Sequence, residues 1–430
     1  MKCLVWEVSK MVRQAISMNE LLTSVQDKSI VMIGESTHGT HEFYKVRAEI
    51  TKELISEYGF SIVAIEGDWP DTFRINRFVK HLSNDTATQA LSDFKRFPLW
   101  MWRNKVMVDF INWLHEFNKN LSIKTGVFGI DLYGINNAFG NILEILNTMN
   151  PEAANLAKQR YSCLGLRDFD SDQYAKDTYQ ALKDCEDEVI RQLLDIKKFI
   201  NDQNNVYDDE DCLLNLHLSA QNIAAAEAYY RNLYQPGVST WNIRDGHMMK
   251  CLNILMENER KKLKRPPKVI VWAHNSHVGD ASADHRQTQH EITLGEIAKE
   301  HFEERVALIG MMTSSGSVTA ADNWGDPAKY FYLNQAHPDS HAAYLARLNK
   351  GNFIAQTNTE GFQTLRLERA VGVIYRPETE IRSHYFNSSL AKRFDWLIYL
   401  EKTSALKPLD NISTWKPNLD KAMDTYPIGL

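Results

Sequence analysis

Seven short runs of apolar residues constrain the fold more than any other feature of this sequence. Each run has the length of a strand, is bounded by turn or polar residues, and does not alternate between apolar and polar positions. Continuous apolar runs indicate strands buried on both faces, as in a mostly parallel sheet covered by helices. The runs lie at Ser29–Gly34, Phe60–Ile65, Val127–Ile130, Lys268–Ala273, Arg305–Met311, Ala370–Tyr375 and Asp395–Leu400.

The segment between the first two runs has the spacing of an amphipathic helix. Phe43, Val46, Ile50 and Leu54 recur at intervals of three and four residues, which places them on one helical face. A strand, a helix and a second strand in this order form a β-α-β unit. We therefore predict an α/β fold with a mostly parallel central sheet flanked by helices.

Two longer stretches, about 71–120 and 137–264, show helical periodicity and little strand signal. The clearest long helices are expected at Tyr179–Ile200 and Asp211–Tyr234. The sequence thus predicts an α/β core in two parts, 1–136 and 265–430, the first with a helical excursion at about 71–120. A large α-helical insertion, or lid, is expected between them at 137–264.

Charge and cysteine content narrow the class of protein. The 49 Lys and Arg residues against 55 Asp and Glu give a net charge of -6, so no basic field favours nucleic acid as a partner. No stretch approaches the ~18 apolar residues of a membrane-spanning helix, and the N-terminus lacks the apolar segment of a signal peptide. The five cysteines are scattered without a C-x-x-C pair, so neither a disulfide framework nor a Cys-rich zinc site is expected. We therefore expect a cytoplasmic protein without a membrane partner.

Carboxylate and imidazole side chains follow four of the predicted strands. The first strand runs into Glu35 and His38, the second into Glu66, the third into Asp131, and the fourth into His274–His277. In open α/β sheets, ligands bind outside the carboxyl ends of the strands. Acid–base or metal chemistry requires such groups to converge from different elements. We therefore expect an active site at this edge of the sheet.

Several common catalytic motifs are missing from the sequence. It has no G-x-S-x-G nucleophile elbow, no G-x-x-x-x-G-K-[ST] phosphate loop, no G-x-G-x-x-G and no H-E-x-x-H. The usual α/β form of the ester-hydrolase triad is thus unsupported. Activation of water by a histidine or by a metal remains.

Five features in a fixed order resemble the erythromycin esterase family. They are GESTHGTHEF (Gly34–Phe43), an arginine on the next helix (Arg47), AIEGDWP (Ala64–Pro70), STWNIRDGHMMK (Ser239–Lys250) and VIVWAHNSHVG (Val269–Gly279). The resemblance covers most of the chain and ends near Phe394–Leu409. It implies an α/β core with a helical insertion, and hydrolysis of the macrolactone ester of 14-membered macrolide antibiotics. The family also holds members, some termed succinoglycan biosynthesis proteins, whose substrates are unknown.

The general base is assigned to His38. An unperturbed imidazole has a pKa of ~6.5, which suits activation of water at neutral pH, and His38 matches the family's essential histidine. Glu35 and Glu66 match acidic positions of the family's site and are expected to orient that imidazole or the water.

Two histidines that are three residues apart, His274 and His277, can share one helical face and point into one cleft. Either can polarise the ester carbonyl. We assign His274, together with Arg244, to stabilisation of the tetrahedral oxyanion.

Substrate contacts are expected from a further set of side chains, namely His277, Arg47, Asp131, Trp69 and Arg74. No cofactor is predicted. A divalent metal is the alternative means of activating water, because His38, Glu66, His274 and His277 are ligand types that zinc accepts. His41 is expected to be exposed rather than a ligand.

The function that these features favour is opening of the lactone of erythromycin-like macrolides by His-activated water, with antibiotic resistance as the effect. The macrolide and water are the only partners expected. One alternative keeps the same site but has a different lactone or ester as substrate. Another is a metal- or haem-binding protein that uses the same histidines.

Overall fold

The chain forms two compact units. A computed structural model describes residues 15–165, 169–182, 184–203, 210–263, 265–283, 291–348, 351–359 and 361–415. Unit 1 comprises Met1–Val63, Phe78–Thr125 and Lys268–Leu430, and unit 2 comprises Ala64–Arg77 and Gly126–Pro267. The chain passes from unit 1 to unit 2 within strand β3 (Ile62–Asp68).

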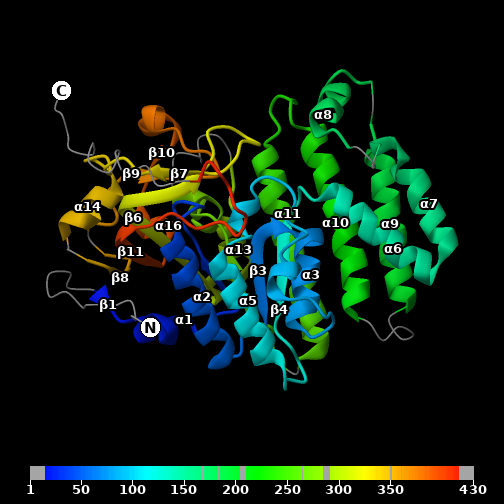
Figure 1. The fold of residues 1–430 in the computed structure, drawn as a ribbon, viewed down its shortest axis with the longest axis horizontal. Helices are drawn as coiled ribbons and strands as arrows, with labels where there is room; N and C mark the ends of the chain where they lie inside the picture. The colour runs from blue at the N-terminus through cyan, green and yellow to red at the C-terminus, as the bar shows by residue number, and fades with distance from the viewer. Residues whose placement is uncertain are drawn as a thin grey trace. The chain divides into compact units, whose positions relative to one another are not determined.

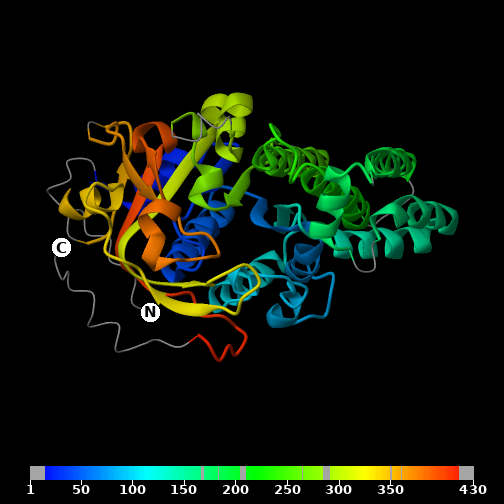
Figure 2. The same cartoon turned by 90° about the horizontal axis from the view of Figure 1, so that it is seen from above.

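A mostly parallel sheet forms the centre of unit 1. Its strands run in the order β1 (Ala15–Ile16), β8 (Phe353–Gln356), β11 (Trp396–Thr403), β6 (Val306–Ala320), β2 (Ile30–Ile33) and β5 (Val269–Trp272). Strands β5, β2, β6 and β11 pair in parallel, whereas β8 and β1 add antiparallel pairings at one side. The end of β6 forms an antiparallel ladder with β7 (Lys329–Tyr332), and both strands are yellow in Figure 2. A separate hairpin joins β9 (Arg366–Arg369) to β10 (Tyr385–Ser388).

Helices with one apolar face complete unit 1. Phe43, Val46, Ile50 and Leu54 are fully buried in α2 (His41–Ser56), as their spacing predicts. Helix α2 packs beside α5 (Lys105–Asn118), and the two run side by side in Figure 1. The other helices of this unit are α1 (Met18–Val25), α4 (Ala87–Ala90), α12 (Asn275–Val278), α13 (Leu294–Phe302), α14 (His341–Leu348), α15 (Glu380–Ser383) and α16 (Leu390–Arg393).

Unit 2 is mainly helical. Besides the end of β3 and strand β4 (Gly126–Asp131) it contains most of α3 (Trp69–Val79), then α6 (Ile135–Met149), α7 (Pro151–Tyr161), α8 (Ser171–Tyr179), α9 (Glu186–Gln203), α10 (Glu210–Arg231) and α11 (Thr240–Lys262). Helix α10 packs against α6, α8, α9 and α11, and a continuous apolar core joins α6 to α10. In the part of the chain that the structure describes, no helix has the length and apolar content needed to span a bilayer.

The predicted α/β class and mostly parallel sheet are confirmed, with two local corrections. The run Ala370–Tyr375 is not a strand, because its residues bridge two separate partners, Val371 with Thr37 and Ile374 with Ala321. The helix predicted at Tyr179–Ile200 is instead the end of α8 and, after an interruption, α9. Ala181 lies in this interruption with a φ of 55°. The insertion predicted at 137–264 falls inside unit 2.

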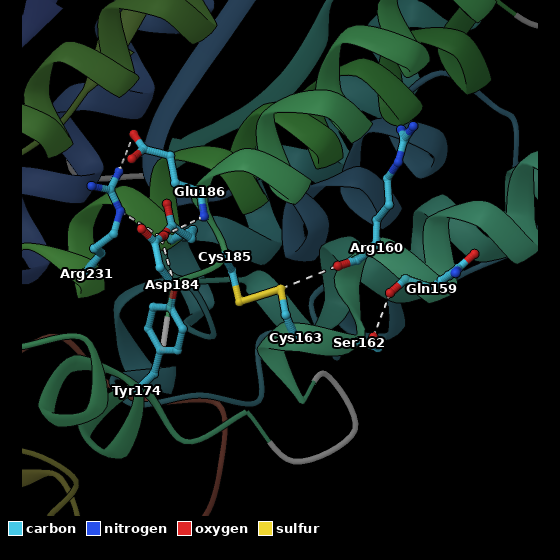
Figure 3. The surroundings of a disulfide bond; sticks show 10 residues. Gln159, Arg160, Ser162, Cys163, Tyr174, Asp184, Cys185, Glu186 and Arg231 are labelled. Atoms are coloured by element: carbon cyan, nitrogen blue, oxygen red, sulfur yellow. Dashed lines mark hydrogen bonds and ion pairs between the residues drawn. A yellow bond between two sulfur atoms is a disulfide. The ribbon is translucent and has the colours of Figure 1, made fainter. Parts of the chain in front are cut away.

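A disulfide between Cys163 and Cys185 contradicts the expectation that the cysteines remain unpaired. The two Cα atoms lie 5.9 Å apart, although 22 positions separate the residues in sequence. Figure 3 shows the bond between the turn after α7 and the start of α9. Scattered cysteines gave no signal of this pairing, because only the packing of α7 against α9 brings the two segments together. The cysteines therefore no longer support the expected cytoplasmic location.

Reduction of this disulfide is predicted to lower the thermal stability of the protein. Closing a loop of this length removes unfolded-state entropy worth about 3 kcal/mol. We expect dithiothreitol to lower the melting temperature by about 3 °C, as followed by circular dichroism. The double variant Cys163→Ser/Cys185→Ser should melt at the lower temperature with or without reductant.

Cys212, which takes no part in the disulfide, supplies the matched control. Cys212→Ser should keep both the wild-type melting temperature and its sensitivity to dithiothreitol. A wild-type protein whose melting is indifferent to reductant would contradict the prediction.

Candidate active site

A buried group in unit 1 contains four predicted site residues, and we call Glu35, His38, Arg47 and His274 the first group. Nδ1 of His38 lies 3.0 Å from Oε1 of Glu35, and Nη2 of Arg47 lies 2.8 Å from Oε2 of the same carboxylate. The side chains of Glu35 and Arg47 are 1% and 0% exposed. Because a guanidinium stays protonated in proteins, its partner here is the ionised carboxylate.

The contact with Glu35 decides which nitrogen of His38 carries the proton. An ionised carboxylate can only accept hydrogen bonds, so Nδ1 of His38 must donate. In the neutral ring Nε2 is then the basic nitrogen. This is the protonation state that a general base requires before it takes a proton from water.

The hydrogen bonds of His274 place its proton on the other ring nitrogen. It precedes α12, and its Nδ1 accepts a hydrogen bond from the backbone N–H of Ser276 at 3.1 Å. The hydroxyl of Ser276 lies 2.8 Å from the same nitrogen. Since a backbone N–H can only donate, Nδ1 of His274 is unprotonated and Nε2 carries the proton. The rings of His38 and His274 lie 4.8 Å apart between centroids, so an acceptor imidazole stands beside a donor imidazole.

His277, at the end of the same turn, is 2% exposed, and its backbone N–H donates to the carbonyl of His274. Sequence reasoning did not single out Ser276, although it stands two residues after His274, in the segment whose two histidines were expected to share a helical face. Its role depends on backbone geometry, which the residue types alone do not reveal.

A second group lies in unit 2 and consists of Glu66, Asp131 and Arg244, with Tyr133 beside them. Arg244 on α11 reaches Oε1 of Glu66 at 2.8 Å and both oxygens of Asp131, at 2.9 Å from Nε and 2.6 Å from Nη2. Burial alone would lower the pKa of Arg244, but the charges around it, chiefly Asp131, raise that pKa well above its ordinary value. The guanidinium also lies 5.2 Å from the ring centre of Tyr133. Arg244, predicted to meet an oxyanion, is thus bound to two carboxylates.

The remaining predicted contacts lie on α3. Trp69 is 1% exposed, stacks on Phe128 and donates its indole N–H to Asn215 at 2.9 Å. It therefore belongs to the core of unit 2, where its ring has no surface to offer a substrate. Arg74 is half-buried on the same helix.

The described residues do not form the metal site that the alternative mechanism requires. Among the described residues, no three His, Cys, Asp or Glu side chains come together in a way that could hold a metal ion. In the first group, Nδ1 of His38 and Nδ1 of His274 already have partners, Glu35 and Ser276. The described residues therefore do not fit a bound metal.

A family model and a named relative both identify the erythromycin esterase family. The family model described as erythromycin esterase matches residues 55–403, most of the chain. Erythromycin esterase type II of Escherichia coli is 22% identical over 417 residues, which cover 88% of this chain and 91% of that protein. Putative hydrolase YbfO of Bacillus subtilis (strain 168) is 21% identical over 315 residues, which cover 70% of this chain and 68% of the relative.

A solved structure shares the fold. The structure of a mutant of the erythromycin esterase EreC in its open conformation has a TM-score of 0.67 at 15% identity. The match covers 93% of this chain and 98% of that chain. The α/β architecture with a large helical part is therefore shared with a solved erythromycin esterase.

Replacement of Arg47 is predicted to destabilise unit 1. Arg47→Met removes the partner of a buried carboxylate, and an uncompensated buried charge typically lowers the free energy of unfolding by about 3–5 kcal/mol. Arg47→Lys keeps the charge and should lose less. Chemical denaturation of both variants measures this, and wild-type stability in Arg47→Met would show that Glu35 does not need its partner.

A buried histidine of unit 2 is predicted to make stability depend on pH. Burial lowers the pKa of His247 to about 4, whereas an unfolded histidine titrates near 6.5. As the pH falls from 6.5 to 4, only the unfolded chain gains this proton, so stability is present above that range and is lost within it. Relative to wild type, His247→Gln should gain up to about 3 kcal/mol between pH 7 and pH 4. Denaturation curves at several pH values test this, and a constant difference between the two proteins would refute it.

Proposed function

Because the chain belongs to the erythromycin esterase family, we propose that this hydrolase opens the macrolactone ester of 14-membered macrolides such as erythromycin, with His38 as the base. The pair of oppositely hydrogen-bonded imidazoles, His38 and His274, is the observation that supports this mechanism. Inactivation of the antibiotic, and hence resistance, would be the effect of the reaction.

The first group supplies the parts of an ester hydrolysis. Nε2 of His38 takes a proton from water as the oxygen of that water attacks the carbonyl carbon. The resulting imidazolium is stabilised by Glu35 through Nδ1, and Arg47 keeps Glu35 ionised and fixed in place. Nε2–H of His274 donates to the carbonyl oxygen as it becomes an oxyanion.

Collapse of the tetrahedral intermediate completes the proposed cycle. The bond between the carbonyl carbon and the alkoxide oxygen breaks, and His38 returns its proton to that oxygen. The product is one open-chain molecule that carries a carboxylic acid and an alcohol group and contains the atoms of the lactone and one water. His38 is then neutral again, so no other reagent is consumed.

Roles for the second group are proposed from the residue types of its members. The roles proposed for Glu66 and Arg244 are orientation of the water and stabilisation of the oxyanion. Substrate contacts of His277, Asp131 and Arg74 also remain proposals, whereas the buried ring of Trp69 is better explained as core. Glu66→Gln keeps the size of the side chain and removes its charge. The activity of this variant tests whether the Glu66 carboxylate takes part in the reaction or serves only as a partner of Arg244.

Loss of the His38 imidazole is predicted to abolish most of the activity. General-base catalysis typically contributes 10²–10⁴-fold, so His38→Ala should reduce kcat by about 10³-fold. The measurement is mass spectrometry of erythromycin incubated with enzyme, which detects addition of one water. His41→Ala changes a histidine three residues away, outside the first group, and serves as the matched control with activity near that of wild type.

Three further arms of the same experiment separate the alternatives. A chelator that stops the reaction would support the metal mechanism instead. A 16-membered macrolide tests the preference for ring size. If wild-type enzyme leaves every macrolide intact but cleaves another lactone or ester in a reaction that needs His38, the mechanism stands and the substrate is different. Near-native turnover by a folded His38→Ala variant would refute the mechanism.

A further inference from the structure

A second buried arginine lies next to the turn that carries His274 and His277. Arg393 ends α16, and its Nε lies 3.0 Å from Oε2 of Glu368 on β9. Neither side chain has exposed surface, and the hydroxyl of Ser388 donates to the same carboxylate oxygen at 2.7 Å. Desolvation of both charges offsets most of the attraction in such a pair, so net stability is a weak explanation for it.

The guanidinium of Arg393 holds the backbone between the two histidines. Nη2 of Arg393 donates to the carbonyl of Asn275 at 2.8 Å. The backbone N–H of Asn275 donates to the carbonyl of Glu35 at 2.8 Å, and its side-chain amide donates to the carbonyl of Met311 at 3.0 Å. Asn275 is therefore fixed by the loop of the first group, by β6 and by Arg393.

Arg393 also contacts the far end of this turn. A Cβ atom at Gly279 would lie 2.6 Å from Cζ of Arg393, so the guanidinium can approach only because residue 279 has no side chain. The backbone N–H of Asp280 donates to the carbonyl of Arg393 at 3.0 Å. The rings of Phe386 and Phe394 lie 5.1 and 5.2 Å from Cζ. Arg393 thus contacts α12 at both ends and is itself confined.

We propose that Arg393, held by Glu368, is a positioning residue that sets the orientation of His274. The proposal rests on the proposed function, in which His274 donates to the substrate carbonyl. Displacement of the Asn275 carbonyl moves the adjoining N–H of Ser276, and this N–H fixes Nδ1 of His274 as an acceptor. Arg393 acts through this backbone link and has no contact with substrate in the proposed reaction.

Arg393→Lys separates the charge of the side chain from its geometry. Lysine keeps a positive charge for Glu368, but one ammonium cannot reproduce the fork that holds Glu368 and Asn275 together. We expect a folded protein with kcat lower by about 10²-fold, because small displacements of a catalytic group have effects of this size. KM should stay within about threefold of wild type, since in the proposed reaction the hydrogen bond from His274 strengthens only as the carbonyl oxygen becomes an oxyanion.

The neighbouring residue on β9 provides the matched control. Arg369 forms its own buried ion pair with Glu380 at 3.0 Å, with side chains 2% and 7% exposed. Its hydrogen bonds go to Tyr385 and Asn334, which lie outside α12. Arg369→Lys should lower the melting temperature as Arg393→Lys does, but leave kcat unchanged. Where Arg393→Lys does not fold, Glu368→Gln against Glu380→Gln gives the same comparison.

A spectroscopic readout separates this proposal from the proposed function. Nitrogen-15 NMR of the imidazole of His274 should show an unprotonated Nδ1 and a protonated Nε2 in wild type and in Arg369→Lys. In Arg393→Lys we expect a mixture of tautomers. Equal loss of kcat in both variants, or an unchanged His274 spectrum in Arg393→Lys, would overturn the positioning role. If wild type cleaves no ester, the proposed function fails, and the NMR comparison still decides what Arg393 does.

Discussion

The ion pair between Arg47 and Glu35 is the contact on which the first group depends. Both charges are removed from water, so each needs the other, and an unpaired member would be strongly destabilising. Arg47 also lies 4.4 Å from the ring centre of Tyr44 and 5.3 Å from that of Trp272, which holds the guanidinium within the core of unit 1. The paired carboxylate then has one oxygen left for His38, and this contact fixes the direction of the hydrogen bond. A buried ion pair thus determines which nitrogen of the His38 ring carries the proton.

Parallel strand order explains why the two histidines meet. Strands β2 and β5 are neighbours, with Ile33 opposite Trp272, so the chain leaves both strands at the same level. The segments that follow are then joined by the hydrogen bond from Asn275 to Glu35. Glycine is required at position 34, because a Cβ atom there would lie 2.2 Å from Oδ1 of Asn275. His38 lies beside His274 for two reasons. The ends of the two strands approach each other closely, and the residue at their point of contact has no side chain.

The sequence predicted those parts of the structure that burial alone determines. Six of the seven apolar runs are strands, because a strand covered on both faces needs continuous apolar residues. Strand β7 was missed because it is half-exposed and reads Lys-Tyr-Phe-Tyr, with no such run. Glu35 and His38 were found because both follow the first strand within one turn. Three features could not be predicted in this way. The disulfide and the pairing of Arg244 with Glu66 and Asp131 depend on distances between segments remote in sequence. The contact of Ser276 with His274 depends on local backbone geometry. Residue types and their spacing carry neither kind of information.

The buried thiol of Cys251 is another candidate nucleophile, which would attack the ester in place of activated water. Sγ of Cys251 lies 3.4 Å from Nε2 of His247, one turn earlier on α11, a distance suited to a thiol–imidazole pair. Burial raises the pKa of Cys251 far above its ordinary range and lowers that of His247 to about 4. Transfer of the proton from sulfur to nitrogen would create two buried charges, so the pair stays neutral and the sulfur is not a thiolate. His38 differs in having a carboxylate, itself paired with Arg47, to stabilise the imidazolium. A histidine near a potential nucleophile is therefore not enough to activate that nucleophile. The first group differs in that a buried, ionised carboxylate contacts the ring of its histidine.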